Sequence, residues 1–130
     1  MTTTVHSVPP ALAERFTSAF NTFVAAVTGA VTDAAQDPQL AAASSFGAWN
    51  NKVLPLLRRQ NAAVQQAAEA LRRGDPGPIL ASAEDKRGLA KDLDGFPLTF
   101  AGPAHAATLD ALETALVTAA WQLCAAAGIP

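Results

Sequence analysis

The sequence predicts an all-α protein, and three observations support this fold class. Half of the 130 residues are apolar, and about a quarter of the chain is alanine, the best helix former and a residue that allows helices to approach closely. No run of alternating apolar and polar residues indicates a strand. Four amphipathic segments follow one another with short connections, so we expect an antiparallel, up-and-down four-helix bundle whose second helix is kinked at Pro55.

A chain of this length suits a single hydrophobic core. We expect residues 1–8 to form an extended polar tail and residues 9–130 to form one helical-bundle domain. The Pro9–Pro10 pair starts the first helix, because proline is tolerated in a first helical turn. The apolar positions of this helix recur every three or four residues and predict one buried stripe: Leu12, Phe16, Phe20, Phe23, Val24, Val27 and Val31.

The second helix is expected over residues 38–73, because Asp37 is a good N-cap and Pro38 suits the first helical position. A straight helix over this range would be about 54 Å long, too long for a domain of this size. Pro55 lacks a backbone donor and clashes with the carbonyl of Asn51. The apolar stripe nevertheless keeps its register through Pro55, so we expect one kinked helix or two helices nearly end to end.

The third and fourth helices have similar signals. Asp75–Pro76 repeats the cap and opens a shorter helix to about Leu93, with Ile79, Leu80, Ala83, Leu89, Ala90 and Leu93 on its apolar side. The fourth helix begins at Pro103 and ends near Ala127, with Gly128 as its C-terminal stop. Its apolar stripe is His105, Leu109, Leu112, Leu116, Ala119, Ala120, Leu123 and Ala127.

The residues that could carry catalytic or metal chemistry do not form a known pattern. Neither His6 nor His105 has a glutamate three residues earlier, as a di-iron bundle requires. The Asp92–Gly95 stretch lacks carboxylates at both anchoring ends of a calcium loop. Cys124 has alanines rather than basic residues beside it, and no nucleophile elbow or phosphate loop is present. We therefore expect no metal, no cofactor and no enzymatic activity.

The charge pattern bears on the choice of partner. The formal net charge is −2, so no overall positive field would gather nucleic acid. Basic residues of the second helix are spaced to share one side, and they predict a cationic strip: Lys52, Arg58, Arg59, Arg72 and Arg73. An anionic patch on a protein partner is the expected counterpart of this strip.

Location is predicted from absences in the sequence. The first residues lack a basic stretch followed by an apolar run, so they do not form a Sec signal peptide. No window of 18 residues is apolar enough to span a bilayer, which predicts no membrane insertion. Cys124 is the only cysteine and fits a reducing compartment. We expect a cytoplasmic protein, with secretion by a route that uses no Sec signal left open.

The stretch around Pro55 has two interpretations. In the first, Trp49 and Trp121 are large fillers of an alanine-rich core. In the second, the kink opens a slot whose walls and mouth are Phe20, Phe23, Phe46, Trp49, Asn50 and Asn51. An apolar pocket with a few polar groups at its entrance is the usual composition of a small-molecule site. If a ligand site exists, we expect it here.

The alanine-rich composition, the small size, the lack of a signal peptide and the helical hairpins resemble the small helical proteins of type VII secretion. Those proteins carry Trp-x-Gly in the turn between two helices, whereas this chain has the reverse order, Gly47-Ala48-Trp49. Their Tyr-x-x-x-Asp/Glu export signal has no counterpart, because the chain contains no tyrosine. The resemblance implies a helical hairpin protein exported without a Sec signal.

The function that these observations favour is a non-catalytic helical interaction module, acting as a homo-oligomer or as an accessory subunit of a larger assembly. The lack of a catalytic pattern, the alanine-rich helix faces and an apolar content beyond what a small monomer hides all favour it. A carrier or sensor of a small apolar ligand, bound near Pro55, is the alternative. A small protein similar to those of type VII secretion is the second alternative.

Overall fold

The computed structural model describes residues 8–130, and every regular element in that range is helical. The predicted all-α class is therefore confirmed. The elements in chain order are α1 (Pro10–Ala35), α2 (Pro38–Ala41), α3 (Ser44–Ala48), the π-helix η1 (Trp49–Val53), α4 (Leu54–Arg72), α5 (Gly77–Lys86), α6 (Leu89–Asp92) and α7 (Pro103–Ala126). Most of the tail predicted for residues 1–8 lies outside the described residues; Val8 is half-buried and packs against the core.

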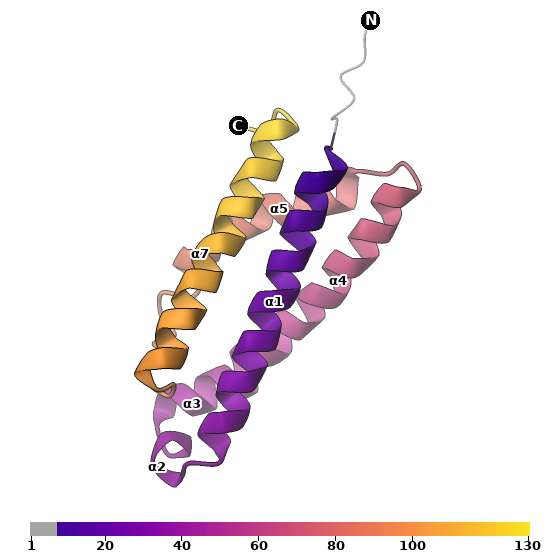
Figure 1. The fold of residues 1–130 in the computed structure, drawn as a ribbon. Coiled ribbons are helices and arrows are strands. Elements are labelled where there is room, and N and C mark those ends of the chain that lie inside the picture. The colour runs from indigo at the N-terminus through magenta and orange to yellow at the C-terminus, as the bar shows by residue number, and fades with distance from the viewer. Residues whose placement is uncertain (1–7) are drawn as a thin grey trace, which may run out of the picture.

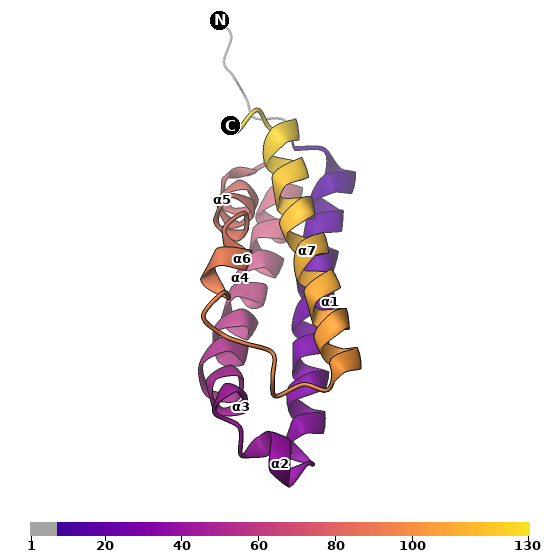
Figure 2. The ribbon, with the colours of Figure 1, turned by 90° about the vertical axis from the view of Figure 1, so that its left-hand side faces the viewer.

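The long helices run along one axis (Figure 1). α1 leads to the end where α2 and α3 lie, α4 returns beside it, and α7 runs back toward the end where α1 begins. α1 packs against α4 and α7, and α5 packs against the same two helices from the other side. From the end of α6, the loop extends along the same axis to the start of α7 (Figure 2). These contacts close a ring of helices around a common core.

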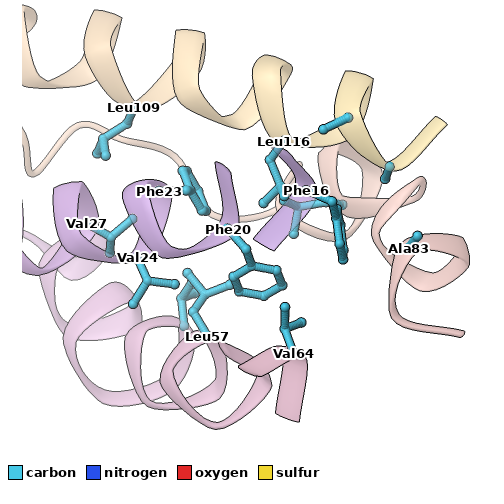
Figure 3. Packing of buried hydrophobic residues seen from close by; sticks show 14 of the residues in the cluster. Phe16, Phe20, Phe23, Val24, Val27, Leu57, Val64, Ala83, Leu109 and Leu116 are labelled. Atoms are coloured by element: carbon cyan, nitrogen blue, oxygen red, sulfur yellow. The ribbon is translucent and has the colours of Figure 1, made fainter. Parts of the chain in front are cut away.

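The core is built on the apolar stripe of α1. Phe16, Phe20, Phe23 and Val27 are completely or almost completely buried, which confirms the stripe predicted from their spacing. Phe16 and Phe20 meet edge to face, with ring centroids 6.3 Å apart. Figure 3 shows Phe20 directed toward α4. Side chains from the other helices complete this cluster, among them Leu57, Val64, Ala83, Leu109 and Leu116.

The helix expected over residues 38–73, as one kinked helix or as two nearly end to end, is instead broken at residues 42–43 and not at Pro55. α2 ends at Ala41, and a turn precedes α3. From Ser44 to Arg72 the path is helical throughout but passes through η1, where the N–H of Leu54 donates to the carbonyl of Trp49, five residues earlier. Pro55 lies in the first turn of α4. In a π turn each backbone hydrogen bond reaches the carbonyl five residues earlier instead of four. This longer spacing gives the ring of Pro55 room beside the preceding carbonyls.

The predicted third helix is also divided, by a turn at residues 87–88 between α5 and α6. Gly88 has a low helix propensity, and its N–H bonds to Asp85 in a tight turn instead of continuing the helix. The predicted apolar side of this segment is confirmed at Ile79, Ala83 and Leu89, which are buried. It is wrong at Ala90, which is exposed, whereas Leu93 is partly buried.

The predicted helix boundaries mostly agree with the structure. The Asp37 carboxylate accepts from the N–H of Gln39 at 2.9 Å, and the Asp75 carboxylate accepts from that of Gly77 at 3.1 Å. Gly128 has a φ of +79°, and the N–H of Ile129 donates to the Cys124 carbonyl, a Schellman cap that only glycine adopts without strain. The predicted stop of the last helix is therefore confirmed.

Candidate functional site

The residues predicted to form a slot at the kink are not gathered around one cavity. Phe20 and Phe23 are buried in the core between the long helices. Phe46 and Trp49 lie elsewhere, on either side of the Phe100 ring, with centroid distances of 6.5 Å and 5.7 Å to it. The remaining two predicted residues, Asn50 and Asn51, are exposed and hydrogen-bonded to each other.

Trp49 anchors the loop between α6 and α7. Its side chain is only 2% exposed, and its indole N–H donates to the carbonyls of Phe96 and Pro97 at 3.2 Å and 3.1 Å. Because a buried indole N–H needs an acceptor, these bonds fix the loop against η1. The core-filling role predicted for Trp49 agrees with this burial.

Beside this anchor, a groove runs between η1–α4 on one side and α5–α6 on the other. Its volume is about 120 Å³. Leu56, on the α4 wall, is 45% exposed although it is a large apolar side chain. We call this cavity the α4–α6 groove, and its lining residues are Lys52, Val53, Leu56, Leu57, Gln60, Lys86, Leu89, Asp92, Leu93 and Phe96.

The α4–α6 groove contains a buried ammonium group. Lys86 is 3% exposed, and its Nζ donates to Gln60 Oε1 at 2.7 Å and to Asp85 Oδ2 at 2.9 Å. The same Nζ lies 5.6 Å from the centre of the Phe20 ring. Lysine is rarely buried, so the residue type of Lys86 predicts an exposed side chain. Its spacing from Ile79 and Ala83, both buried, is the signal that places it on the inner side of α5.

A second cavity, of about 240 Å³, lies on the other side of the anchored loop. Trp49 and Phe96 line it together with three carboxylates, those of Asp94, Asp110 and Glu113. Burial, and then the charge of Asp110, raise the pKa of Glu113 above its ordinary value. Within residues 8–130, no group of three or more metal-binding side chains has the proximity that a metal site requires.

A third cavity, of about 500 Å³, lies between the first turns of α1 and the last turns of α4. Val8 and Pro10 line it on one side, and Leu71 and Arg72 line it on the other.

The predicted cationic strip lies on η1 and α4, and all five of its side chains are exposed. Arg72 forms an ion pair with Glu69 one turn earlier. Between residues 8 and 130, the other four take part in no ion pair: Lys52, Arg58, Arg59 and Arg73. The strip therefore keeps cations that an anionic surface could neutralise.

The outer face of α7, in contrast to the cationic strip, is uncharged and contains an exposed tryptophan. Trp121 is 52% exposed, so the core-filling role predicted for it is wrong. Residues 114–130 contain no Asp, Glu, Lys or Arg. We define the α7 outer face by exposed residues that follow one another along one side of the helix: Ala111, Thr114, Ala115, Thr118, Trp121, Gln122 and Ala125.

Cations border the α7 outer face from two neighbouring helices. The Arg87 guanidinium, just after α5, lies 4.6 Å from the Trp121 ring centre, a stacking arrangement typical of arginine. On the other side, Arg15 of α1 donates to Gln122 at 3.4 Å. The face itself is uncharged between these two contacts.

The remaining residues singled out from the sequence have local roles. Cys124 is fully buried; burial raises the pKa of its thiol, Arg87 lowers it and Glu84 raises it. His105, predicted on the apolar stripe of the last helix, is instead exposed, and its Nε2 lies 2.9 Å from Asp33 Oδ2. Gly47-Ala48-Trp49 runs from α3 into η1 and lies inside a helical path.

Two further findings complete the description. Across the described residues, none of the helices combines the length and the apolar character needed to cross a bilayer. Comparisons of the chain with protein-family models, with curated proteins and with solved structures find no match in any of the three.

Proposed function

We propose that this protein is a non-catalytic interaction module, built as an antiparallel four-helix bundle, that self-associates through the α7 outer face. In that form it would serve as an accessory subunit of a larger protein assembly. The observation that carries the proposal is the exposure of Trp121, 52%, on a helix face without charges. Tryptophan is among the residues that contribute most to binding when an interface buries them.

The energetics favour this face over the cationic strip. A tryptophan side chain buries roughly 150–250 Å², so covering the exposed half of Trp121 would contribute about 2 kcal/mol per copy at about 25 cal/mol per Å². In a two-fold dimer each residue appears on both partners. The α7 outer face has no charged residue of its own and would meet itself with cations, Arg15 and Arg87, only at its borders, whereas pairing two copies through Arg58 and Arg59 would bring cations together.

Light scattering at micromolar concentration tests the proposal. We expect a mass above the 13.3 kDa of the monomer. Trp121→Glu should return the mass to that of the monomer, because it puts a charge at the centre of the interface. Leu56→Glu is the matched control, since it replaces an equally exposed apolar residue outside the α7 outer face, and it should leave the mass unchanged. A wild-type protein that stays monomeric at all concentrations would overturn self-association.

A second candidate function is supported by a separate observation. The α4–α6 groove lies beside η1 and the first turn of α4, in the region of Pro55. Its walls are mostly apolar and include a few polar groups, the usual composition of a small-molecule site. We therefore keep the carrier or sensor of a small apolar ligand as the second proposal, with this groove as its site.

Cytoplasmic action is our proposal for either function, because Cys124 has no second cysteine with which to pair.

A further inference from the structure

The feature of the α4–α6 groove that calls for an explanation is Lys86. Burying an ammonium group is unfavourable unless hydrogen bonds and opposite charges replace its water. An ammonium group has three N–H donors, and two of them have acceptors, Gln60 Oε1 and Asp85 Oδ2. In the part of the chain that the structure describes, the Phe20 ring lies 5.6 Å from Nζ, and no third hydrogen-bond acceptor meets this group. One donor of a nearly fully buried cation thus remains for a ligand.

The walls of the groove indicate what kind of molecule would accompany that donor. Leucine side chains of α4 and of α6 with its C-cap, together with Phe96, supply apolar lining to the groove that Lys86 also lines. Leu56 is 45% exposed, so part of this lining now faces water. The volume of about 120 Å³ is well below the roughly 300–1,000 Å³ of sites for drug-sized ligands. A drug-sized ring system is therefore too large for the groove, whereas a slender chain can extend out of it past the exposed Leu56.

The charges at the groove favour an anionic head group. Lys52 and Lys86 line it against one carboxylate, that of Asp92. Asp85, the ion-pair partner of Lys86, has a side chain that is 64% exposed, so water already satisfies much of its charge. A carboxylate is the simplest anion that accepts from an ammonium N–H in a charge-assisted hydrogen bond.

We propose that the α4–α6 groove binds an anionic amphiphile with a slender alkyl chain. Its carboxylate accepts from Lys86 Nζ, with Lys52 near the groove entrance, and its chain lies along Leu56, Leu89 and Leu93. This inference rests on the second candidate function and is independent of self-association through α7.

The groove has a structural reason to be where it is. The π turn of η1 supplies Lys52 and Val53 to the α4 wall, and single π turns are frequent at functional sites. The two bonds from Trp49 to the carbonyls of Phe96 and Pro97 hold the loop that supplies Phe96 to the groove. The site is therefore held by elements that are already fixed in the fold.

Isothermal titration calorimetry with three ligands of equal chain length tests the proposal: octanoate, 1-octanol and octyltrimethylammonium. We expect octanoate to bind about tenfold or more tightly than either of the others, the ratio for one hydrogen bond to a charged group. Lys86→Met should remove that preference. Arg58→Met, which removes an exposed cation outside the groove, is the matched control and should retain it.

Lys86 is buried, so its replacement requires a check on folding. Circular dichroism of each variant supplies that check, and Lys52→Met and Leu56→Glu provide two substitutions at exposed groove positions. Leu56→Glu should weaken octanoate binding about tenfold or more, because it places a carboxylate beside the chain and the head group. Octanoate binding that survives both Lys86→Met and Leu56→Glu would place the ligand elsewhere and overturn the inference.

The other outcomes separate this inference from the proposed functions. If octanoate and 1-octanol bind equally well, the groove is an apolar ligand site but the role of Lys86 is overturned. If none of the three ligands binds, the inference and the ligand-binding function both fail. Light scattering on the same samples reports self-association independently, so a mass above that of the monomer without octanoate binding would leave only the first proposal standing.

Discussion

The two tryptophans have opposite surroundings, and this difference can be measured residue by residue. Trp49 is buried and bonded to two carbonyls of the loop, whereas Trp121 lies on the surface against Arg87. In the Trp121→Phe variant, the remaining indole should be almost inaccessible to acrylamide until the protein unfolds. In the Trp49→Phe variant, the remaining indole should be quenched readily at low protein concentration. Rapid quenching of Trp121→Phe would mean that Trp49 is not an anchor.

Glu113 makes stability depend on pH. Burial, assisted by the charge of Asp110, raises the pKa of Glu113 above its ordinary value, so the folded state binds a proton more readily than the unfolded state. The unfavourable contribution to stability therefore grows as the pH rises from the ordinary pKa through the raised pKa and is complete above it. Glu113→Gln should be more stable than the wild type at pH 7.

The pH dependence of this difference is the decisive part of the measurement. Below about pH 4, the wild-type carboxyl group is protonated in both states, so thermal unfolding of Glu113→Gln and of the wild type should coincide. Glu84→Gln is the control, because Glu84 is exposed. A gain in melting temperature that is the same at pH 4 and at pH 7 would contradict the assigned cause.

At the scale of elements, the sequence predicts where helices begin and end better than where they break. Asp37, Asp75 and Gly128 act locally, through one or two hydrogen bonds each, and their roles follow from residue type alone. The break after Ala41 and the turn at Gly88 are not evident in the apolar spacing. A helix can lose one turn and resume with its buried side still facing the same core.

Pro55→Ala tests the account of η1. The substitution restores a backbone donor and removes the clash with the preceding carbonyls, but the π turn already accommodates the proline. We therefore expect the free energy of unfolding in urea to change by no more than about 1 kcal/mol. Pro103→Ala, in the first turn of α7, is the control. A change of about 3 kcal/mol or more at Pro55 alone would show that the proline itself maintains the local structure.

Val53→Asp tests the phase of the helix at its irregular point. Val53 is 3% exposed, so an aspartate there would bury an unpaired charge and destabilise the protein by several kcal/mol, a large part of the stability of a small domain. Lys52→Asp changes the neighbouring exposed residue and should have little effect on stability. Equal melting temperatures for the two variants would contradict the side of η1 assigned to Val53.

The candidate site shows a different limit of the sequence. The α4–α6 groove lies beside Pro55, but of the residues proposed from the sequence for a ligand or a partner only Lys52 lines it. Phe20 and Phe23, which the sequence analysis assigns to the walls of the proposed slot, are buried core residues. The burial of Lys86 does not follow from its residue type, because lysine is rarely buried. Only its spacing from the buried residues of α5 indicates that it faces the core.

At the scale of the whole molecule, alanine limits what a pattern can predict. It is tolerated both inside and outside, so residue type alone does not distinguish Ala119 and Ala120, which are buried, from Ala115, which is exposed; only their spacing from the leucines of the stripe predicts the difference. The ring of helices decides this by enclosing the phenylalanines of α1. What it leaves outside is an uncharged α7 outer face with Trp121 in it.

A dilution series of tryptophan emission tests most directly the claim that this face mediates association. Trp49 stays buried at every concentration, so a change in the spectrum reports on Trp121. The account predicts that emission moves to longer wavelength as the protein is diluted from the concentration at which light scattering finds an oligomer. The Trp121→Phe spectrum should not move. An oligomer that dissociates over this range without any shift in wild-type emission would contradict the claim, because Trp121 would then lie outside the interface.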